Sequence, residues 1–318
     1  MKVITSNKIC KSFEKKRYSF RNFLKPEITV KNAITDLDLE IMEGEFVGFL
    51  GPNGAGKTTF LKILTGIMHP TSGEAEVLGY TPWQRNYKYL KQIAIVMGQK
   101  NQLWWDIPAI DSFNLLREVY SIPEKQYKTN LDRMVDMLGM HNLVNSRLRE
   151  MSLGERMKCE LTACFLHNPR VIFLDEPTIG LDVVSARAIR VFLKQINKDN
   201  GCTVILTSHY MADIEELCQR IFIINKGKKV YDGDIKELLS KFSSEKIVKV
   251  VLNDVSDRQK FSRLHHKKSL LDGDGIIRCS NSQIATVAKD LFDLFPAENI
   301  AINNVDIEEV ITKMFDQR

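Results

Sequence analysis

The chain has 318 residues, of which 44% are hydrophobic and 27% are charged. This composition is ordinary for a soluble globular protein and excludes disordered and collagen-like chains. No apolar run approaches the about 20 residues of a membrane span, and the N-terminus lacks the apolar core of a signal peptide. The cysteines form neither a CxxC pair nor a zinc-ligand spacing, so reduced thiols are expected. We therefore expect a cytosolic chain whose membrane partner, if it has one, is a separate polypeptide.

The N-terminal segment concentrates positive charge. Short strands are predicted over residues 1–13 and 33–42, and the insert 14–32 between them is rich in lysine and arginine. A basic arm of this kind could face nucleic acid or an anionic membrane surface, and it could equally be a solvated face. The charge pattern leaves these interpretations open.

Downstream, apolar strands alternate with helices. Buried strands are predicted over residues 45–50, 171–174 and 203–207, and residues 107–168 are predicted to be mostly helical. One helix there carries an apolar stripe that ends at a glycine suited to a C-cap: Tyr127, Leu131, Met134, Val135, Leu138 and then Gly139. The alternation predicts an α/β fold with a largely parallel sheet in three layers.

The pattern changes after residues 243–245, which are typical of a linker. Beyond them a small α+β unit is predicted, with strands at 247–252, 275–279 and 300–302 and helices at 284–295 and 307–315. The pair His265 and His266 is expected in a solvated loop. This C-terminal unit shows no chemical motif, so we expect an accessory or regulatory role for residues 243–318.

The turn between the first buried strand and the helix after it matches the phosphate-loop pattern G-x-x-x-x-G-K-[ST]. Its residues are Gly51, Pro52, Asn53, Gly54, Ala55, Gly56, Lys57 and Thr58. The glycines let successive backbone amides point toward phosphate oxygens, and the helix N-terminus adds its positive end. Lys57 can reach the β- and γ-phosphates, and Thr58 can offer its hydroxyl to Mg²⁺. With the adjoining Thr59, this loop is expected to bind the phosphates of ATP.

Polar residues also end the other two buried strands. Asp175 and Glu176 lie at the carboxyl edge of the sheet, where Asp175 would hold Mg²⁺ and Glu176 would orient or deprotonate the attacking water. His209 could contact the γ-phosphate, although a lone histidine in such a place is more often structural. Gln99 follows the apolar run 93–97, and its amide could touch Mg²⁺ or the water.

The segment from Met151 to Glu155, here called the signature segment, heads a predicted helix. Ser152 suits an N-cap or a phosphate contact, and Gly154 allows close approach of the backbone. Taken alone, the segment could simply be a helix cap.

The order and spacing of these pieces resemble the nucleotide-binding subunit of an ABC transporter, over roughly residues 1–235. The resemblance implies a P-loop ATPase domain over residues 1–242, with an antiparallel β part and a helical subdomain at about residues 100–168. It implies ATP and Mg²⁺ as cofactors. It also implies catalytic roles for Glu176, His209 and Lys57.

The resemblance further implies that two subunits hold two ATP molecules between them. Ser152 and Gly154 of one subunit would then contact the γ-phosphate bound by the other. Asp182, in the loop Gly180–Asp182, would cross that interface. Phe13 matches the aromatic residue that stacks on adenine, although the insert 14–32 exceeds the usual spacing after it.

The segment from Gly98 to Asp106 looks like that of ATPase subunits of ABC-2-type transporters, a group associated largely with export. The resemblance implies separate integral membrane permeases as partners and a homodimer or heterodimer of ATPase subunits. It places the protein peripherally at the cytoplasmic face of the cell membrane, with no nucleic acid expected as a partner. The pair Trp104 and Trp105 would either contact the permease or form core of the helical subdomain.

The signature segment departs from the common Leu-Ser-Gly-Gly-Gln at Met151, Leu153 and Glu155, while Ser152 and Gly154 are kept. Two alternatives to a transporter subunit fit the sequence less well. A soluble ABC ATPase that acts on DNA or translation would carry a long coiled coil or two cassettes, and a P-loop kinase or GTPase would not need the signature segment.

Overall fold

The computed structural model describes residues 1–17, 27–98, 100–242, 245–265, 271–272, 275–304, 307, 310–311 and 314. The chain divides into two compact units, residues 1–233 and 234–318. The helix α8 (Ile235–Phe242) falls in the second unit. The boundary expected at residue 243 stays a prediction.

A six-stranded sheet in the order β5-β6-β7-β3-β8-β9 forms the centre of the first unit within the described residues. Its strands are β3 (Phe46–Leu50), β5 (Ile93–Met97), β6 (Val171–Asp175), β7 (Thr203–Thr207), β8 (Arg220–Asn225) and β9 (Lys228–Asp234). The pairings from β5 to β8 are parallel. The parallel strands β3, β5, β6, β7 and β8 consist mostly of apolar residues, because helices and a second sheet cover their faces. The predicted strands 171–174 and 203–207 are confirmed.

A three-stranded antiparallel sheet has the order β2-β1-β4 and contains β1 (Lys2–Arg17), β2 (Glu27–Met42) and β4 (Ser72–Val77). The prediction of short strands around an insert at 14–32 is wrong, because both strands continue into that insert. Phe13 pairs with Lys31 and Glu14 with Val30, since the β-branched residues of the segment favour a strand despite its charge. Residues 18–26 of the insert lie outside the described residues.

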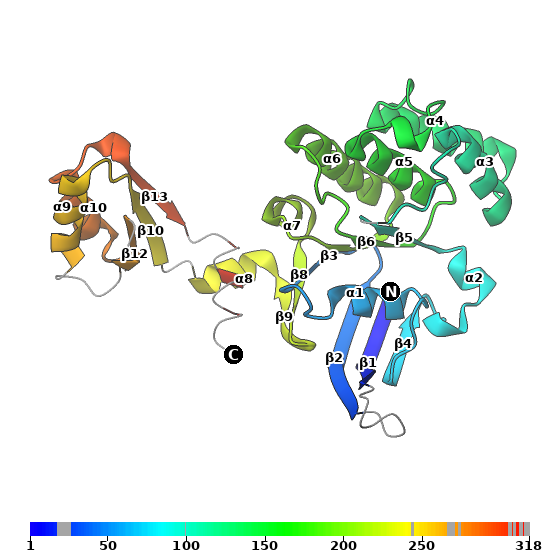
Figure 1. Ribbon diagram of the computed structural model, residues 1–318, viewed down its shortest axis with the longest axis horizontal. Helices are drawn as coiled ribbons and strands as arrows, with labels where there is room; N and C mark the ends of the chain where they lie inside the picture. Colours follow the sequence, from blue (N-terminus) through cyan, green and yellow to red (C-terminus); the bar gives the residue numbers. More distant parts are fainter. Residues whose placement is uncertain are drawn as a thin grey trace. The chain divides into compact units, whose positions relative to one another are not determined.

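Helices cover the six-stranded sheet of the first unit. Figure 1 shows that the helices α3 to α6 gather on one side of this sheet, whereas β1, β2 and β4 lie on the other. The helices of this unit are α1 (Lys57–Leu64), α2 (Tyr87–Leu90), α3 (Ala109–Tyr120), α4 (Glu124–Leu138), α5 (Leu153–Phe165), α6 (Val183–Asn200) and α7 (Met211–Leu217). None of the helices in the described part of the chain has the length and apolar character of a membrane span.

The core of the first unit joins both sheets through α1. Phe60 of α1 is fully buried in the same cluster as Ile4 of β1 and Phe173 of β6. The apolar stripe predicted from Tyr127 to Leu138 is the buried face of α4, which ends at Gly139 with φ of 62°. Helix α1 ends at Leu64, so Ile67 lies beyond it and is exposed.

The second unit contains a four-stranded antiparallel sheet in the order β11-β12-β10-β13. Its remaining elements are β10 (Glu245–Val250), α9 (Val255–His265), β11 (Leu271–Asp272), β12 (Ile276–Ser280), α10 (Ile284–Phe292) and β13 (Ile300–Asn304). The order β-α-β-β-α-β is that of a split βαβ fold. The sequence missed α9, because few of its residues are apolar, and it placed His265 in a loop rather than at the end of this helix. His266 lies outside the described residues, as does most of the predicted helix 307–315.

Candidate functional site

The phosphate loop connects β3 to α1 and bends through glycines. Gly54 and Gly56 have φ angles of 78° and 113°, in the left-handed region that favours glycine. A Cβ at Gly56 would lie 2.6 Å from the carbonyl oxygen of Ala33, so a larger residue would force the neighbouring strand to move. The first turn of α1 contains no acidic residue. Its free amides and positive end can therefore bind an anion without a competing carboxylate in the helix.

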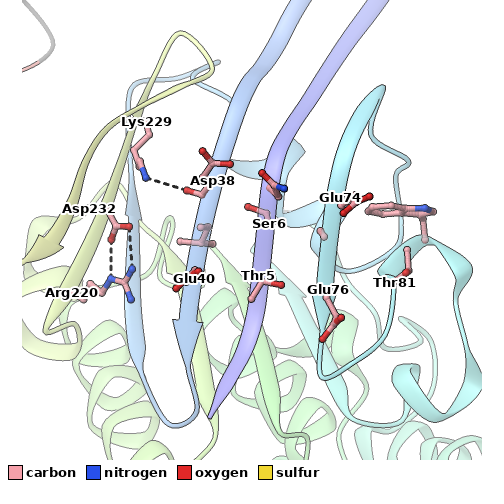
Figure 2. Close-up of a pocket in the computed structure, with 14 residues that line it drawn as sticks. Thr5, Ser6, Asp38, Glu40, Glu74, Glu76, Thr81, Arg220, Lys229 and Asp232 are labelled. Carbon is pink, nitrogen blue, oxygen red and sulfur yellow. Dashed lines mark hydrogen bonds and ion pairs between the residues drawn. The ribbon is translucent and has the colours of Figure 1, made fainter.

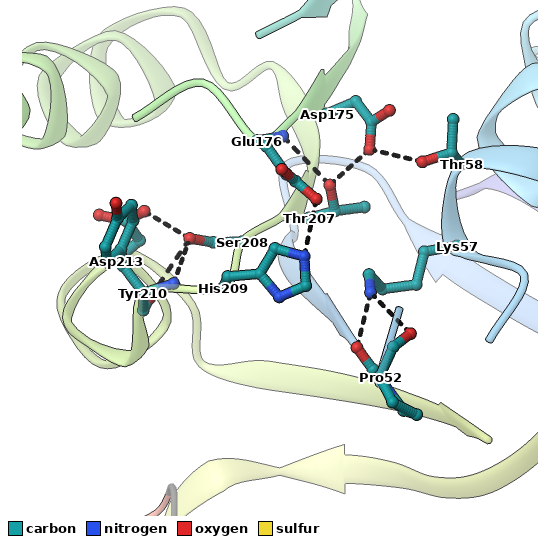
Figure 3. Close-up of polar contacts among 11 residues, drawn as sticks. Pro52, Lys57, Thr58, Asp175, Glu176, Thr207, Ser208, His209, Tyr210 and Asp213 are labelled. Atoms are coloured by element: carbon teal, nitrogen blue, oxygen red, sulfur yellow. Dashed lines mark hydrogen bonds and ion pairs between the residues drawn. The ribbon is translucent and has the colours of Figure 1, made fainter. Parts of the chain in front are cut away.

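Lys57 is buried, with only 6% of its surface exposed. Its Nζ donates to the carbonyl oxygens of Gly51 at 2.6 Å and Pro52 at 3.2 Å (Figure 3). Burial lowers the pKa of Lys57, and the carboxylates of Glu176 and Asp175 oppose this shift. A buried ammonium group held by two neutral carbonyls is strongly stabilised by an anionic ligand, and a polyphosphate is such a ligand.

The Asp175 carboxylate links the phosphate loop to the edge of the sheet. Its Oδ1 accepts hydrogen bonds from the hydroxyls of Thr58 at 3.1 Å and Thr207 at 2.7 Å (Figure 3). Asp175 lies opposite Thr207 in the register of β6 and β7, so the strand pairing fixes this geometry. Thr58 and Asp175 place two oxygen atoms together, and oxygen atoms are the ligands that Mg²⁺ prefers.

Glu176 and His209 point toward each other at the same edge (Figure 3). Nε2 of His209 lies 2.9 Å from Oε1 of Glu176. The backbone of Glu176 has φ of 57°, and its N–H donates to the carbonyl of Thr207 at 3.0 Å and to the hydroxyl of Thr207 at 3.1 Å. Non-glycine residues held in the left-handed region are strained and cluster at functional sites.

Gly98 has no side chain and so leaves room for this backbone conformation of Glu176. A Cβ at position 98 would lie 2.1 Å from the carbonyl oxygen of Glu176. The N–H of Gly98 also donates to the carbonyl of Asp175 at 2.8 Å. In the sequence, the one signal of this role is the position of Gly98 between the apolar run 93–97 and Gln99.

A buried network supports the loop that carries His209. The carboxylate of Asp213 is fully buried and accepts hydrogen bonds from the hydroxyl of Ser208 at 2.6 Å and from that of Thr178. Arg190 neutralises Asp213 across 3.1 Å. The backbone N–H of Tyr210 donates to the hydroxyl of Ser208 at 2.9 Å (Figure 3). The network therefore holds the residues on both sides of His209.

The signature segment forms the start of α5. Ser152 is the N-cap, and its hydroxyl and backbone N–H form a capping box with Glu155. Gly154 approaches α6 so closely that a Cβ there would lie 2.4 Å from Oγ of Ser185. The N-cap predicted at Ser152 is confirmed. The close approach at Gly154 is made to Ser185, a contact that sequence spacing could not indicate.

Asp182 is the N-cap of α6 and lies next to the signature segment through Ser185. It accepts hydrogen bonds from the backbone N–H of Ser185 at 2.9 Å and from its hydroxyl at 2.6 Å. These two bonds lower the pKa of Asp182. The loop Gly180–Asp182 and the signature segment thus form one continuous surface, while the role expected for Asp182 in nucleotide binding stays a prediction.

Three other predicted residues or pairs have mixed outcomes. Phe13 lies on β1 with 41% of its surface exposed and the Lys11 ammonium 5.3 Å from its ring centre, and its contact with adenine stays a prediction. Gln99 lies outside the described residues. Trp104 and Trp105 are 47% and 42% exposed, so the interpretation that they are core residues is wrong.

A hollow of about 810 Å³, lined by other residues than the phosphate loop, lies over β1, β2, β4 and the β8–β9 pair (Figure 2). Carboxylates dominate the charged groups of its lining, with Asp38 and Glu40 from β2 and Glu74 and Glu76 from β4. Its Arg220 is bound to Asp232 at 2.8 Å. Because like charges repel, this hollow does not suit a nucleotide, and the phosphate loop is the better site.

These features define a class of protein, the P-loop ATPases, with two acids and a histidine placed at the phosphate loop. The model of the ABC transporter family matches residues 34–179. ABC transporter A family member 8 of Dictyostelium discoideum is 34% identical over 233 residues, which cover 73% of this chain and 27% of that protein. ABC transporter ATP-binding protein NatA of Bacillus subtilis is 30% identical over 216 residues, which cover 68% of this chain and 87% of NatA. Nod factor export ATP-binding protein I of Cupriavidus metallidurans is 30% identical over 207 residues, which cover 65% of this chain and 68% of that protein.

The chain belongs to the ABC transporter ATP-binding proteins, and it binds and hydrolyses ATP to power transport, as the sequence predicted. A solved ATP-binding cassette, a dimer in a post-hydrolysis state with ADP and Pi, superimposes with a TM-score of 0.62 at 22% identity and covers 73% of this chain and 98% of that one. This likeness confirms the predicted fold class. The chain spans about a quarter of the length of the Dictyostelium relative.

Proposed function

We propose that two copies of this chain, or this chain and a second ATPase subunit, close around two ATP molecules and drive a separate membrane permease. The observation that carries the proposal is the convergence of Lys57, Asp175 and Glu176 with His209 at one edge of the sheet. Such an arrangement suits hydrolysis, because positioning and charge stabilisation supply most of the catalysis in phosphoryl transfer.

Each residue has a distinct role in this proposal. Lys57 and the loop amides bind the phosphates, and Glu176 orients and deprotonates the attacking water. His209, hydrogen-bonded to Glu176, holds that carboxylate in place and contacts the γ-phosphate. Both residues act only when the γ-phosphate is present, so hydrolysis weakens the closed state.

The residues also fit a magnesium ion. Thr58 and Asp175 would hold Mg²⁺ together with Gln99, and the ion would neutralise phosphate charge during the reaction. Two protein oxygens placed together suit Mg²⁺, which uses one or two protein oxygens together with the phosphates of a nucleotide.

Exposed apolar side chains near Asp182 support the proposal that two subunits pair. Val183 and Val184 follow Asp182 directly and are 82% and 79% exposed. Leu153, in the signature segment, is also exposed and lies within 3.2 Å of where a Cβ on Gly180 would be. Covering these side chains on a second subunit would bury apolar surface and stabilise the pair.

A groove of about 380 Å³ supports docking of the permease. It is lined by residues of α2, β5, α3 and α5, and its apolar lining includes Leu90, Leu116 and Val119. The exposed Trp104 and Trp105 provide a second apolar contact in the helical subdomain. An amphipathic helix of a permease would suit such a groove.

We also propose an ABC-2-type exporter that works at the cytoplasmic face of the membrane. The segment from Gly98 to Asp106 supports this assignment, as does the likeness to a protein named for Nod factor export. Ile28, Val30 and Lys31 on β2 are exposed, and the basic sequence of the insert 14–32 supports contact of this segment with anionic lipid. Residues 243–318 would act as an accessory or regulatory domain.

The test replaces the proposed catalytic acid by Glu176→Gln, which keeps the size of the side chain and removes its charge. We expect ATP binding to be retained and steady-state hydrolysis to fall by at least about 100-fold. Glu76→Gln is the matched control, because Glu76 lies on β4 in the carboxylate-lined hollow, and this variant should hydrolyse ATP at the wild-type rate. Wild-type turnover by the Glu176→Gln protein would contradict the assignment.

A further inference from the structure

At the N-terminus of α5, the donors of Ser152 already bind an anionic group, which is the side-chain carboxylate of Glu155 in the same chain. The backbone N–H and the hydroxyl of Ser152 both donate to Oε2 of Glu155, at 2.8 Å and 2.9 Å. The amide of Glu155 donates back to the hydroxyl oxygen of Ser152 at 3.3 Å. The carboxylate therefore occupies the two donors of the residue that is proposed to contact the γ-phosphate.

Glu155 is charged in this position. The hydrogen bonds from the backbone and the hydroxyl of Ser152 lower its pKa, and Lys158 adds to the shift. A γ-phosphate that approaches Ser152 must displace a carboxylate of like charge, and the two anions repel each other at short range. A second carboxylate, that of Asp182, lies beyond Ser185 on the same surface and increases the negative potential.

We infer that Glu155 competes with the γ-phosphate for Ser152 and so sets the ATP concentration at which the dimer closes. The inference rests on the proposed composite site, and it gives a function to the acid that replaces the usual glutamine in the signature segment. After hydrolysis, Glu155 can return to the donors of Ser152 as phosphate leaves. Its return favours the open state and speeds the release of products.

The competition needs the charge of Glu155 and not only its hydrogen bonds. Glutamine at the third position of a helix also completes a capping box with an N-cap serine. Glu155→Gln therefore keeps the start of α5 and removes the repulsion. Glu150→Gln is the matched control, because Glu150 is an exposed acid two residues before Ser152 that pairs with Arg149 instead.

The test titrates ATP against dimer formation, measured by light scattering, in the full chain that carries Glu176→Gln. We expect the added Glu155→Gln substitution to lower the half-saturating ATP concentration about tenfold, the effect of removing one close like-charged pair from a partly screened site. Glu150→Gln should change it by no more than about twofold. The difference made by Glu155→Gln should shrink in high salt, which a purely structural effect on α5 would not do.

An unchanged or higher half-saturating concentration in the Glu155→Gln protein, with dimers still forming, would overturn the inference and leave the composite site intact. The same holds if the difference persists unaltered in high salt. If the Glu176→Gln protein binds ATP but no variant forms a dimer, the composite site is itself wrong and the inference fails with it.

Discussion

Replacing Gly98 by alanine tests whether the backbone of Glu176 positions the catalytic acid. The added Cβ would lie 2.1 Å from the carbonyl oxygen of Glu176, which is 0.9 Å inside the 3.0 Å that such contacts respect. The obstructing atom is backbone, so relief requires Glu176 itself to move by about 1 Å. A misplacement of that size lowers the rate of a positioned reaction about 100-fold. We expect kcat to fall by about that factor, while the affinity for ATP, set by the phosphate loop, stays within about twofold.

Steady-state ATP hydrolysis gives kcat, and a fluorescent ATP analogue gives the affinity. Gly79→Ala is the control, because Gly79 has φ of 82° and no atom lies within 4 Å of a Cβ there. That variant should lose about 1 kcal/mol of stability and keep its turnover. Wild-type kcat in a folded Gly98→Ala protein would refute the argument that the contact of Gly98 with Glu176 positions the acid.

Three further predictions follow from other parts of the first unit. Lys57→Ala should abolish ATP binding, and unchanged affinity in a nucleotide titration would contradict the phosphate-loop assignment. Burial lowers the pKa of His167 to about 4, although a hydrogen bond to the Ile93 carbonyl opposes this shift. The folded state therefore favours the neutral imidazole, and the protein loses stability as the pH falls from 6.5 toward 4. Urea unfolding should show about 2 kcal/mol more loss between pH 7 and pH 5 in the wild type than in His167→Gln, and equal losses would count against this. A photocrosslinker at position 105 should capture a co-expressed permease, whereas one at position 76, in the acidic hollow, should not, and capture from both positions or from neither would argue against the tryptophan surface.

The sequence predicted those parts of the site that depend on local patterns. The phosphate loop is recognisable because its glycines and lysine are consecutive, and Asp175 and Glu176 are recognisable because they end an apolar strand. The carboxyl ends of parallel strands meet at one edge, so the meeting of Asp175 with Thr207 follows from the predicted fold.

The remaining features depend on contacts between segments that are distant in the sequence. Nothing near Gly98 indicates that its hydrogen atom faces the carbonyl of Glu176, and nothing near Gly154 indicates the approach to Ser185. The left-handed backbone of Glu176 is imposed by such contacts rather than by local preference. Strands β1 and β2 continue into the insert 14–32, because β-branched residues such as Thr29 and Val30 favour a strand despite the charge around them.

The central claim, that ATP closes two subunits around a shared site, is tested most directly by the mass of the Glu176→Gln protein in solution. Light scattering with Mg²⁺ and saturating ATP should give twice the mass of one chain, and ADP should return the protein to the mass of one chain. Adding Ser152→Ala should weaken the ATP-bound dimer without affecting the binding of ATP to a single chain. A single-chain mass for the Glu176→Gln protein with ATP bound would contradict the account.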